Sequence, residues 1–205
     1  MNLPQAFIFI GRSGSGKGTQ VKLLLEYLKK VDPTHSMLYV ETGSLFRQFL
    51  ALDGYSSQHT KEKNLAGERG ADFMAIYLWS DFLIKNFDTK QTLMFDGSPR
   101  SLTEALAMET ALKFYGFAKA KVIYLDVTPV CATERLEKRG RSDDLAPGGI
   151  AKRLGWFEES VIPAINYYKK SDYYEFVDIN GDQETEKVHQ NIVARLWLNL
   201  NQSPK

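Results

Sequence analysis

The residues with the clearest chemical purpose form a glycine-rich segment near the start of the chain, G-R-S-G-S-G-K at residues 11–17. It fits the pattern G-x-x-x-x-G-K, in which backbone N–H groups turn inward around phosphate oxygens and the lysine supplies a positive charge. The apolar run Ala6–Ile10 precedes it, and a helical apolar pattern follows. This strand–loop–helix context predicts a phosphate-binding loop rather than a purely structural turn.

The residue after Lys17 departs from the common form of this loop. A serine or threonine usually follows the lysine, whereas this chain has Gly18 there and Thr19 one position later. We therefore expect Mg²⁺ to be held more through water and phosphate than through this hydroxyl.

Several separate segments carry distinctive motifs, among them GKGTQ at residues 16–20 and DGSPR at residues 96–100. These segments resemble the adenylate kinase family, whose members are nucleoside monophosphate kinases. The first resembles the family's phosphate loop, and the second resembles its D-G-F-P-R signature. Thr42 and Arg47 lie in a segment that resembles the family's acceptor site. The arginines that resemble those around the family's lid are Arg135, Arg139, Arg141 and Arg153. The resemblance extends from residue 6 to about residue 183, which is most of the chain.

This resemblance implies a set of residues for the ATP side of the site. The ATP phosphates would be held by Gly14, Ser15, Gly16, Lys17, Gly18 and Thr19. Arg135 would lie against the adenine, the backbone near Gln183 would close over its edge, and Arg139 would also contact ATP. Asp96 would orient water on Mg²⁺, the cofactor expected with ATP.

The resemblance also implies an acceptor set. Arg47 and Arg100 would hold the acceptor phosphate, and the acceptor would lie near Thr42, Arg69, Gly70, Gly97 and Glu104. Arg141 and Arg153 would bind AMP and, with Arg139, surround the group in transfer. The expected catalytic residues are thus Lys17, Arg100, Arg139, Arg141 and Arg153.

An arginine-rich set suits this chemistry because the acceptor needs charge neutralisation rather than a general base. A phosphate monoester has a second pKa of about 6, so it is largely dianionic at neutral pH. The obstacle is repulsion between two anions that must meet in line and away from water. Arginine stays charged and grips phosphate through two parallel N–H donors.

Glu104 and Ser98 are departures that bear on acceptor choice. Adenylate-specific family members have glutamine where this chain has Glu104, and an aromatic residue where it has Ser98. Glutamine can donate to adenine N1, whereas an ionised glutamate only accepts and could bridge two donors of guanine. Two interpretations stay open: Glu104 reads the base, or it is a surface residue of a helix.

The leading prediction is an adenylate kinase-like enzyme that reversibly transfers the terminal phosphoryl group of ATP to AMP, giving two ADP. Two alternatives stay open: a kinase for GMP or for UMP/CMP, and a non-catalytic nucleotide-binding protein of the same fold. ATP binding alone would not need Arg47, Arg100 and Arg153 together, which favours the enzyme. The expected partners are ATP and a nucleoside monophosphate.

Apolar runs and helical patterns alternate along the whole chain. This alternation predicts an α/β fold, a P-loop three-layer sandwich whose mostly parallel sheet has helices on both faces. The expected strands are residues 6–10, 37–40, 92–95, 122–125 and 176–178. The expected helices follow the phosphate loop and cover about 44–52, part of 53–70, 71–86, 101–115, 129–138, 150–168 and 184–198.

Residues 1–205 are expected to form a single domain with two small additions. The first is an acceptor-binding insertion at about 41–71, and the second is a short lid at about 139–149. We hypothesise that Pro147, Gly148 and Gly149 form part of a hinge for this lid, a simple turn before a helix being the alternative. Unchanged turnover after replacing both glycines by alanine would count against the hinge.

Composition limits the remaining classes. The formal net charge is +1, which does not favour nucleic acid as a partner. The single cysteine, Cys131, excludes a disulfide scaffold or a multi-cysteine zinc site within one chain, so no zinc is expected. We find no secretion signal and no apolar stretch of about 18 residues, so the expected location is the cytoplasm, without membrane partners. The resemblance suggests a monomer.

Overall fold

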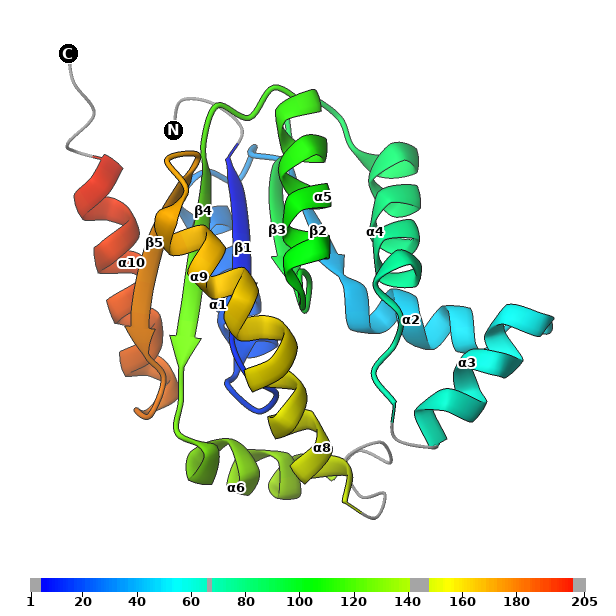
Figure 1. Cartoon of the computed structure of the whole chain (residues 1–205). Helices are drawn as coiled ribbons and strands as arrows, with labels where there is room; N and C mark the ends of the chain where they lie inside the picture. Colours follow the sequence, from blue (N-terminus) through cyan, green and yellow to red (C-terminus); the bar gives the residue numbers. More distant parts are fainter. Residues whose placement is uncertain (1–4, 66–67, 141–147, 201–205) are drawn as a thin grey trace.

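The computed structural model of the chain describes residues 5–65, 68–140 and 148–200, and five strands in these ranges form one sheet (Figure 1). The strand order is β2-β3-β1-β4-β5, and every neighbouring pair is parallel. The sheet is thus wholly parallel where we expected it to be mostly so. The strands are β1 (Ala6–Ile10), β2 (Met37–Glu41), β3 (Thr92–Asp96), β4 (Ala120–Asp126) and β5 (Tyr174–Asn180).

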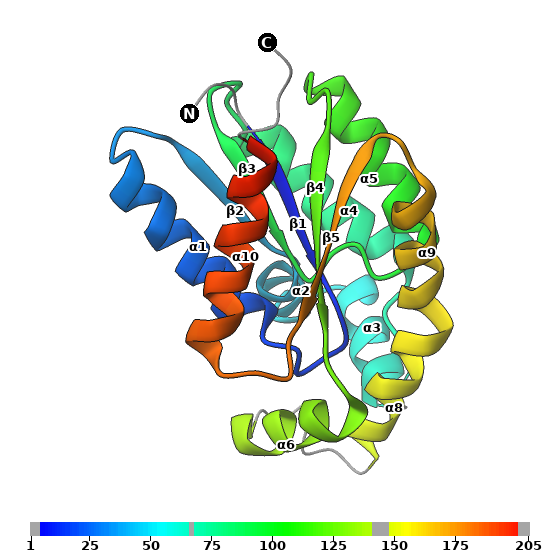
Figure 2. The same cartoon turned by 90° about the vertical axis from the view of Figure 1, so that its left-hand side faces the viewer.

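Helices cover both faces of this sheet, which confirms the three-layer prediction (Figure 2). One face carries α1 (Lys17–Val31) and α10 (Thr185–Leu200). The opposite face carries α4 (Asp72–Asn86), α5 (Leu102–Phe114) and α9 (Ile162–Lys170).

The central strand β1 shows why the strands could be recognised. Ile8 and Ile10 point to the core under α4, α5 and α9, while Phe7 and Phe9 point to the core under α1 and α10. All four side chains are buried, since a parallel sheet with helices on both faces leaves neither side to solvent. A strand of this kind is therefore a continuous apolar run.

The remaining helices lie toward the carboxyl ends of the strands (Figure 1). They are α2 (Thr42–Leu50), α3 (Tyr55–Leu65), α6 (Pro129–Arg139) and α8 (Gly149–Trp156). Ligands of open α/β sheets bind at this edge, so the loops and helix ends here are the place to look for a site.

The predicted helix at 150–168 is wrong in one respect, because it is not one regular α-helix. A π-helical segment, Phe157–Val161, separates α8 from α9, and the Ile162 N–H donates to the Phe157 carbonyl. Pro163 has no N–H to donate, and its ring would clash with the carbonyl four residues earlier in an α-helix. An extra residue in a helical turn shifts the side-chain positions on the two sides of the turn by about 100° around the helix axis.

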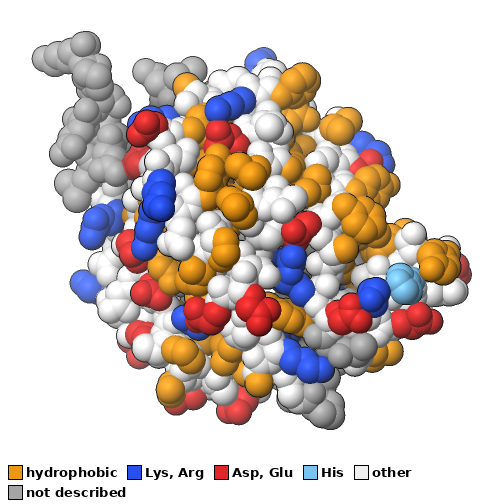
Figure 3. Space-filling model, viewed as in Figure 1, with side chains coloured by type: hydrophobic (Ala, Val, Ile, Leu, Met, Phe, Trp, Pro, Cys, Tyr) orange, Lys and Arg blue, Asp and Glu red, His pale blue; other side chains and the backbone are white. Residues whose placement is uncertain are grey.

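Helix α4 is apolar on both sides, so its pattern alone could not say which side faces the core. Trp79 and Leu83 are buried against the sheet. Phe73, Tyr77 and Ile84 are exposed, and Figure 3 shows apolar side chains on the side of the molecule where α4 lies.

None of the helices in the described ranges combines the length and apolar composition that a membrane crossing requires.

Candidate active site

A cleft of about 1940 Å³ gathers every predicted site residue that the structure describes. It lies at the carboxyl edge, between the phosphate loop, α2, α6 and α8. Its lining includes Gly14, Ser15, Gly16, Lys17, Gly18, Thr19, Thr42, Arg47, Arg69, Gly70, Asp96, Gly97, Arg100, Glu104, Arg135, Arg139, Arg153 and Gln183. Arg141 and most of the predicted lid, with Pro147 of the predicted hinge, lie outside the described residues. Gly148 is described and has a φ of +69°.

The phosphate loop connects β1 to α1 and packs tightly against α6. Gly14 has a φ of +85°, and a Cβ there would lie 2.5 Å from the Ala132 carbonyl oxygen. Gly16 caps α1 in the left-handed conformation, and the first residues of the helix, Lys17, Gly18 and Thr19, line the cleft. This arrangement suits an anion, because the unpaired N–H groups at a helix start carry partial positive charge.

The Lys17 ammonium is held inside the loop. Its Nζ donates to the carbonyl oxygens of Gly11 (2.8 Å) and Arg12 (2.9 Å) and to Ser15 Oγ (3.3 Å). Burial lowers the pKa of Lys17 to about 8, and nearby Arg100 and Arg139 act in the same direction while Asp96 opposes them. A bound polyphosphate would add negative charge and favour the protonated form.

Asp96 ends β3 directly beside the start of α1. Its Oδ2 accepts a hydrogen bond from the Tyr39 hydroxyl (3.0 Å), and a Cβ at Gly18 would lie 3.0 Å from the same oxygen. Burial and the Asp96 carboxylate raise the pKa of Tyr39, so its hydroxyl remains a donor. A carboxylate beside a phosphate loop fits Mg²⁺, which prefers oxygen ligands and keeps several waters.

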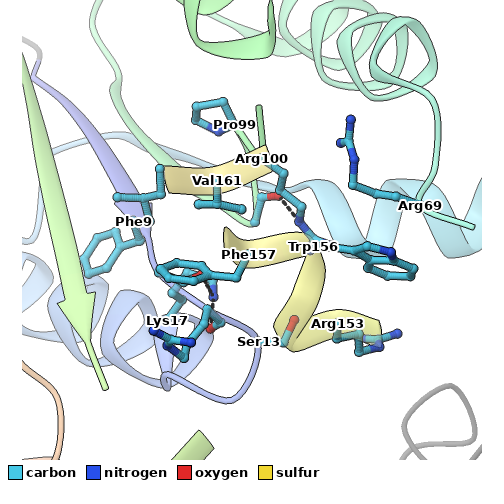
Figure 4. Close-up of a pocket in the computed structure, with 14 residues that line it drawn as sticks. Phe9, Ser13, Lys17, Arg69, Pro99, Arg100, Arg153, Trp156, Phe157 and Val161 are labelled. Atoms are coloured by element: carbon cyan, nitrogen blue, oxygen red, sulfur yellow. Dashed lines mark hydrogen bonds between the residues drawn. The ribbon is translucent and has the colours of Figure 1, made fainter. Parts of the chain in front are cut away.

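Five cationic side chains from several parts of the chain line a pocket beside the phosphate loop, and Figure 4 labels four of them. They are Arg12, Lys17, Arg69, Arg100 and Arg153. Arg100 Nε donates to the Gly97 carbonyl oxygen (2.6 Å), which fixes its guanidinium. Burial lowers the pKa of Arg100, with Arg153 and Arg69 adding repulsion. Such a concentration of positive charge suits a ligand with several phosphates.

Glu104 is not a surface residue of its helix, so that interpretation is wrong. It is only 1% exposed and lines the cleft from the first turn of α5. Glu104 Oε2 accepts from Ser98 Oγ (3.0 Å), and Arg69 Nη1 lies 3.8 Å from Oε1. Burial raises the pKa of Glu104, although Ser98, Arg100 and Arg69 oppose this. The serine replaces an expected aromatic residue and provides a donor for the carboxylate.

The helix α2 brings Thr42 and Arg47 to the other side of the cleft. Thr42 Oγ1 is buried and has no hydrogen-bond partner within the described ranges. Arg47 is half exposed and donates to Glu41 Oε1 (2.9 Å). A Cβ at Gly70 would lie 2.8 Å from Phe46 Cζ, so this turn packs closely on α2.

Arg135 joins α6 to the segment after β5. Its Nη2 donates to the carbonyl oxygens of Gly181 (2.9 Å) and Gln183 (3.3 Å). Arg135 and Gln183 are therefore neighbours, and both line the cleft.

The residues of this region that sequence reasoning missed include Arg12, Tyr39 and Trp156. Tyr39 donates to Asp96, and Trp156 lines the cleft beside Arg153. Arg12 pairs with Glu158, 146 positions away. No local pattern could have indicated that contact, whereas the parallel register of β2 and β3 places Tyr39 near Asp96.

A glycine-rich loop between β1 and α1, faced by several arginines at the carboxyl edge of a parallel sheet, defines the class of P-loop phosphotransferases. The family model "Adenylate kinase" matches residues 9–173. The chain is 33% identical to an adenylate kinase of Prochlorococcus marinus (strain MIT 9515), over 87% of this chain and 92% of that protein. It is 32% identical to adenylate kinase 1 of Nostoc sp. (strain PCC 7120), over 92% of this chain and 97% of that protein.

The chain therefore belongs to the adenylate kinase family. It is an adenylate kinase-like nucleoside monophosphate kinase, an ATP-dependent phosphotransferase. A third relative, an adenylate kinase of Leuconostoc mesenteroides, is 29% identical over 95% of this chain and 97% of its own length.

Proposed function

We propose that this protein transfers the terminal phosphoryl group of ATP to AMP, forming two ADP reversibly and without a covalent enzyme intermediate. The observation that carries the proposal is the gathering of Lys17, Arg69, Arg100 and Arg153 at one pocket beside the phosphate loop. Family membership supports it, and the matched relatives are named adenylate kinases.

On the donor side, the backbone of the phosphate loop and Lys17 hold the ATP phosphates. The N–H groups at the start of α1 face the phosphate oxygens, and Lys17 exchanges its loop carbonyls for them. Arg135 and Gln183 border the adenine at the far end of the cleft, where their mutual contact keeps the wall in place. Asp96 would hold Mg²⁺ through water, and the ion would supply further neutralisation of phosphate charge.

On the acceptor side, arginines replace a general base. Arg47 and Arg100 hold the dianionic phosphate of AMP, and Arg100 is already oriented by Gly97. Arg139, Arg141 and Arg153 surround the group in transfer and stabilise its charge. The nucleoside lies near Thr42, Arg69, Gly70, Gly97 and Glu104.

The organisation of the chain follows from these roles. We propose that residues about 41–71 serve as the acceptor-binding insertion and residues about 139–149 as a short lid, which would exclude water during transfer. We place the enzyme in the cytoplasm as a monomer.

A second candidate acceptor is GMP, and the observation that favours it is the burial of Glu104 in the cleft. An ionised Glu104 could accept from two donors of guanine, while a protonated Glu104 could donate to adenine as glutamine does. The remaining alternatives are a UMP/CMP kinase and a nucleotide binder without activity.

Initial rates with ATP, Mg²⁺ and each of AMP, GMP, UMP, CMP and dTMP separate these candidates. We expect AMP to give the highest kcat/KM in the wild type. A preference for GMP that shifts toward AMP in Glu104→Gln would show that Glu104 reads the base and that the adenylate assignment is wrong. ATP binding without transfer to any monophosphate would favour the non-catalytic alternative.

A further inference from the structure

Arg12, the second residue of the phosphate loop, makes a double contact with the segment between α8 and α9. Its guanidinium carbon lies 4.2 Å from the centre of the Phe157 ring, and its Nη1 lies 3.1 Å from Glu158 Oε1. The Arg12 side chain is only 11% exposed and Phe157 is 2% exposed, so the stacked part of the contact is shielded from water. Glu158 is 60% exposed, so its carboxylate remains hydrated.

The two sides of this contact each carry a residue of the proposed machinery. On the loop side, the Arg12 carbonyl accepts from Lys17 Nζ (2.9 Å) and from the Ser15 N–H (3.1 Å). On the helix side, Phe157 follows Arg153 by four residues, one turn along the same helical stretch. A shift of Phe157 relative to Arg12 would therefore shift Arg153 relative to Lys17.

The chemistry of arginine makes this contact specific. A guanidinium is planar, so it can stack on an aromatic ring and pair with a carboxylate at the same time, which an ammonium does less well. The π-helical segment provides both partners, since Phe157 and Glu158 are its first two residues.

We propose that Arg12 is a positioning residue for phosphoryl transfer, which joins the phosphate loop to the helix of Arg153 through Phe157 and Glu158. This inference rests on the proposed function. Arg12 lines the same pocket as Lys17 and Arg153, but its guanidinium is engaged by Phe157 and Glu158. It therefore acts through Lys17 and Arg153 and not by touching the reacting atoms. Its removal should therefore affect the transfer step more than the binding of ATP.

The test is the steady-state kinetics of Arg12→Met with ATP and AMP. We expect kcat to fall about tenfold while KM for ATP changes less than about threefold, because small misplacements of catalytic groups are costly. Arg12→Lys keeps the charge without the planar stack and should recover only part of the loss. A rise in KM for ATP with unchanged kcat would overturn the inference, since Arg12 would then contribute to ATP binding and not to the transfer step.

A double-mutant cycle tests whether Arg12 and Glu158 act together. Glu158→Ala, at an exposed position, should lower kcat about threefold, and adding it to Arg12→Met should lower kcat no further. Glu159→Ala changes the neighbouring exposed glutamate and serves as the matched control, with kcat expected to equal that of the wild type. Multiplying effects in the double variant would overturn the inference.

Thermal unfolding of each variant keeps a folding defect from being mistaken for mispositioning. If Arg12→Met unfolds below the assay temperature, Glu158→Ala and the Phe157→Leu variant carry the test, and normal kcat in both would overturn the inference. An inactive wild type would instead refute the proposed function. An active wild type with normal Arg12 and Glu158 variants would refute this inference alone.

Discussion

The positive charge of Lys17 is lost over a pH range that depends on the burial of its side chain in the phosphate loop. Burial lowers its pKa to about 8 in the free protein, so part of the charge needed for phosphate is lost just above neutral pH. We expect kcat/KM for ATP to decline as pH rises through about 8, since this ratio reports groups of the free enzyme. The decline in kcat should occur at higher pH, because bound phosphate favours the ammonium form.

Initial rates between pH 6 and 10 at low and saturating ATP measure both profiles. A kcat/KM that stays flat to pH 9.5 would contradict the expectation.

The lowered pKa of Lys17 also predicts how the stability of the folded state changes with pH. The folded state holds fewer protons than the unfolded state between about pH 8 and the ordinary lysine value of 10.5, so this group adds stability as pH rises through that range.

Glu104 should change the stability of the fold with pH in the direction opposite to that of Lys17. Its carboxyl has a raised pKa through burial, so the folded state binds its proton more tightly than the unfolded state. As pH rises from the ordinary value of 4.5 through the folded value, the ionised form lowers the stability of the wild type. Glu104→Gln removes this effect, and its stability relative to the wild type should increase over that range.

Urea unfolding at several pH values between 3 and 7.5 measures the difference. Glu109→Gln is a matched control of opposite sign. Burial raises the pKa of Glu109, but hydrogen bonds from Lys113 and Tyr167 outweigh it and the net shift is downward. That variant should lose stability relative to the wild type as pH rises through the ordinary value of 4.5, and the difference should be constant at higher pH. A pH-independent difference for Glu104→Gln would show that its carboxyl has an ordinary pKa.

At the scale of elements, the phosphate loop depends on its close approach to α6. Gly14→Ala would strain a backbone at φ +85° and place a methyl group 2.5 Å from the Ala132 carbonyl oxygen. The left-handed conformation alone costs about 1–2 kcal/mol for a residue with a side chain, and the clash adds to it. We expect a lower unfolding temperature and at least about tenfold weaker ATP binding.

Gly16→Ala separates the cost of the left-handed backbone conformation from the cost of the clash with α6. Gly16 has a similar φ of +87°, but a Cβ there meets nothing within 4 Å. It should therefore lose less stability than Gly14→Ala, as measured by thermal unfolding. Equal losses would mean that the packing of the loop on α6 contributes little.

At the scale of the whole molecule, one cleft spans the distance between α6 and α2, with arginines from both sides. Ligands that bind only the folded state stabilise it, by about 2.7 kcal/mol at a hundredfold excess over Kd. For a chain of this size that corresponds to a rise in unfolding temperature of about 5–10 °C. We expect a non-hydrolysable ATP analogue and AMP together to raise it more than either alone.

Arg100→Met tests whether the AMP end and the ATP end of the cleft bind their ligands separately. This variant should lose the rise in unfolding temperature that AMP causes and keep most of the rise that the ATP analogue causes. Loss of both rises would indicate that Arg100 supports the whole cleft rather than the acceptor phosphate.

The sequence alone determined the positions of the strands, because strands buried on both faces must be continuous apolar runs. It also determined the phosphate loop, since the glycine spacing and the lysine are properties of one short segment. Element ends were less well predicted: α2 begins at Thr42 rather than Ser44, and β4 and β5 extend beyond their apolar centres.

The tertiary structure alone decided which charges lie near one another. Glu104 reads as a helix residue in the sequence, and only the packing of α5 against the sheet shows that it is buried beside Ser98. The partner of Arg12 lies 146 positions away, on a segment whose π-helical form depends on Pro163 and on its fit to the core. Local patterns report the backbone preferences and burial of a segment, whereas pairing between distant side chains depends on the assembled fold.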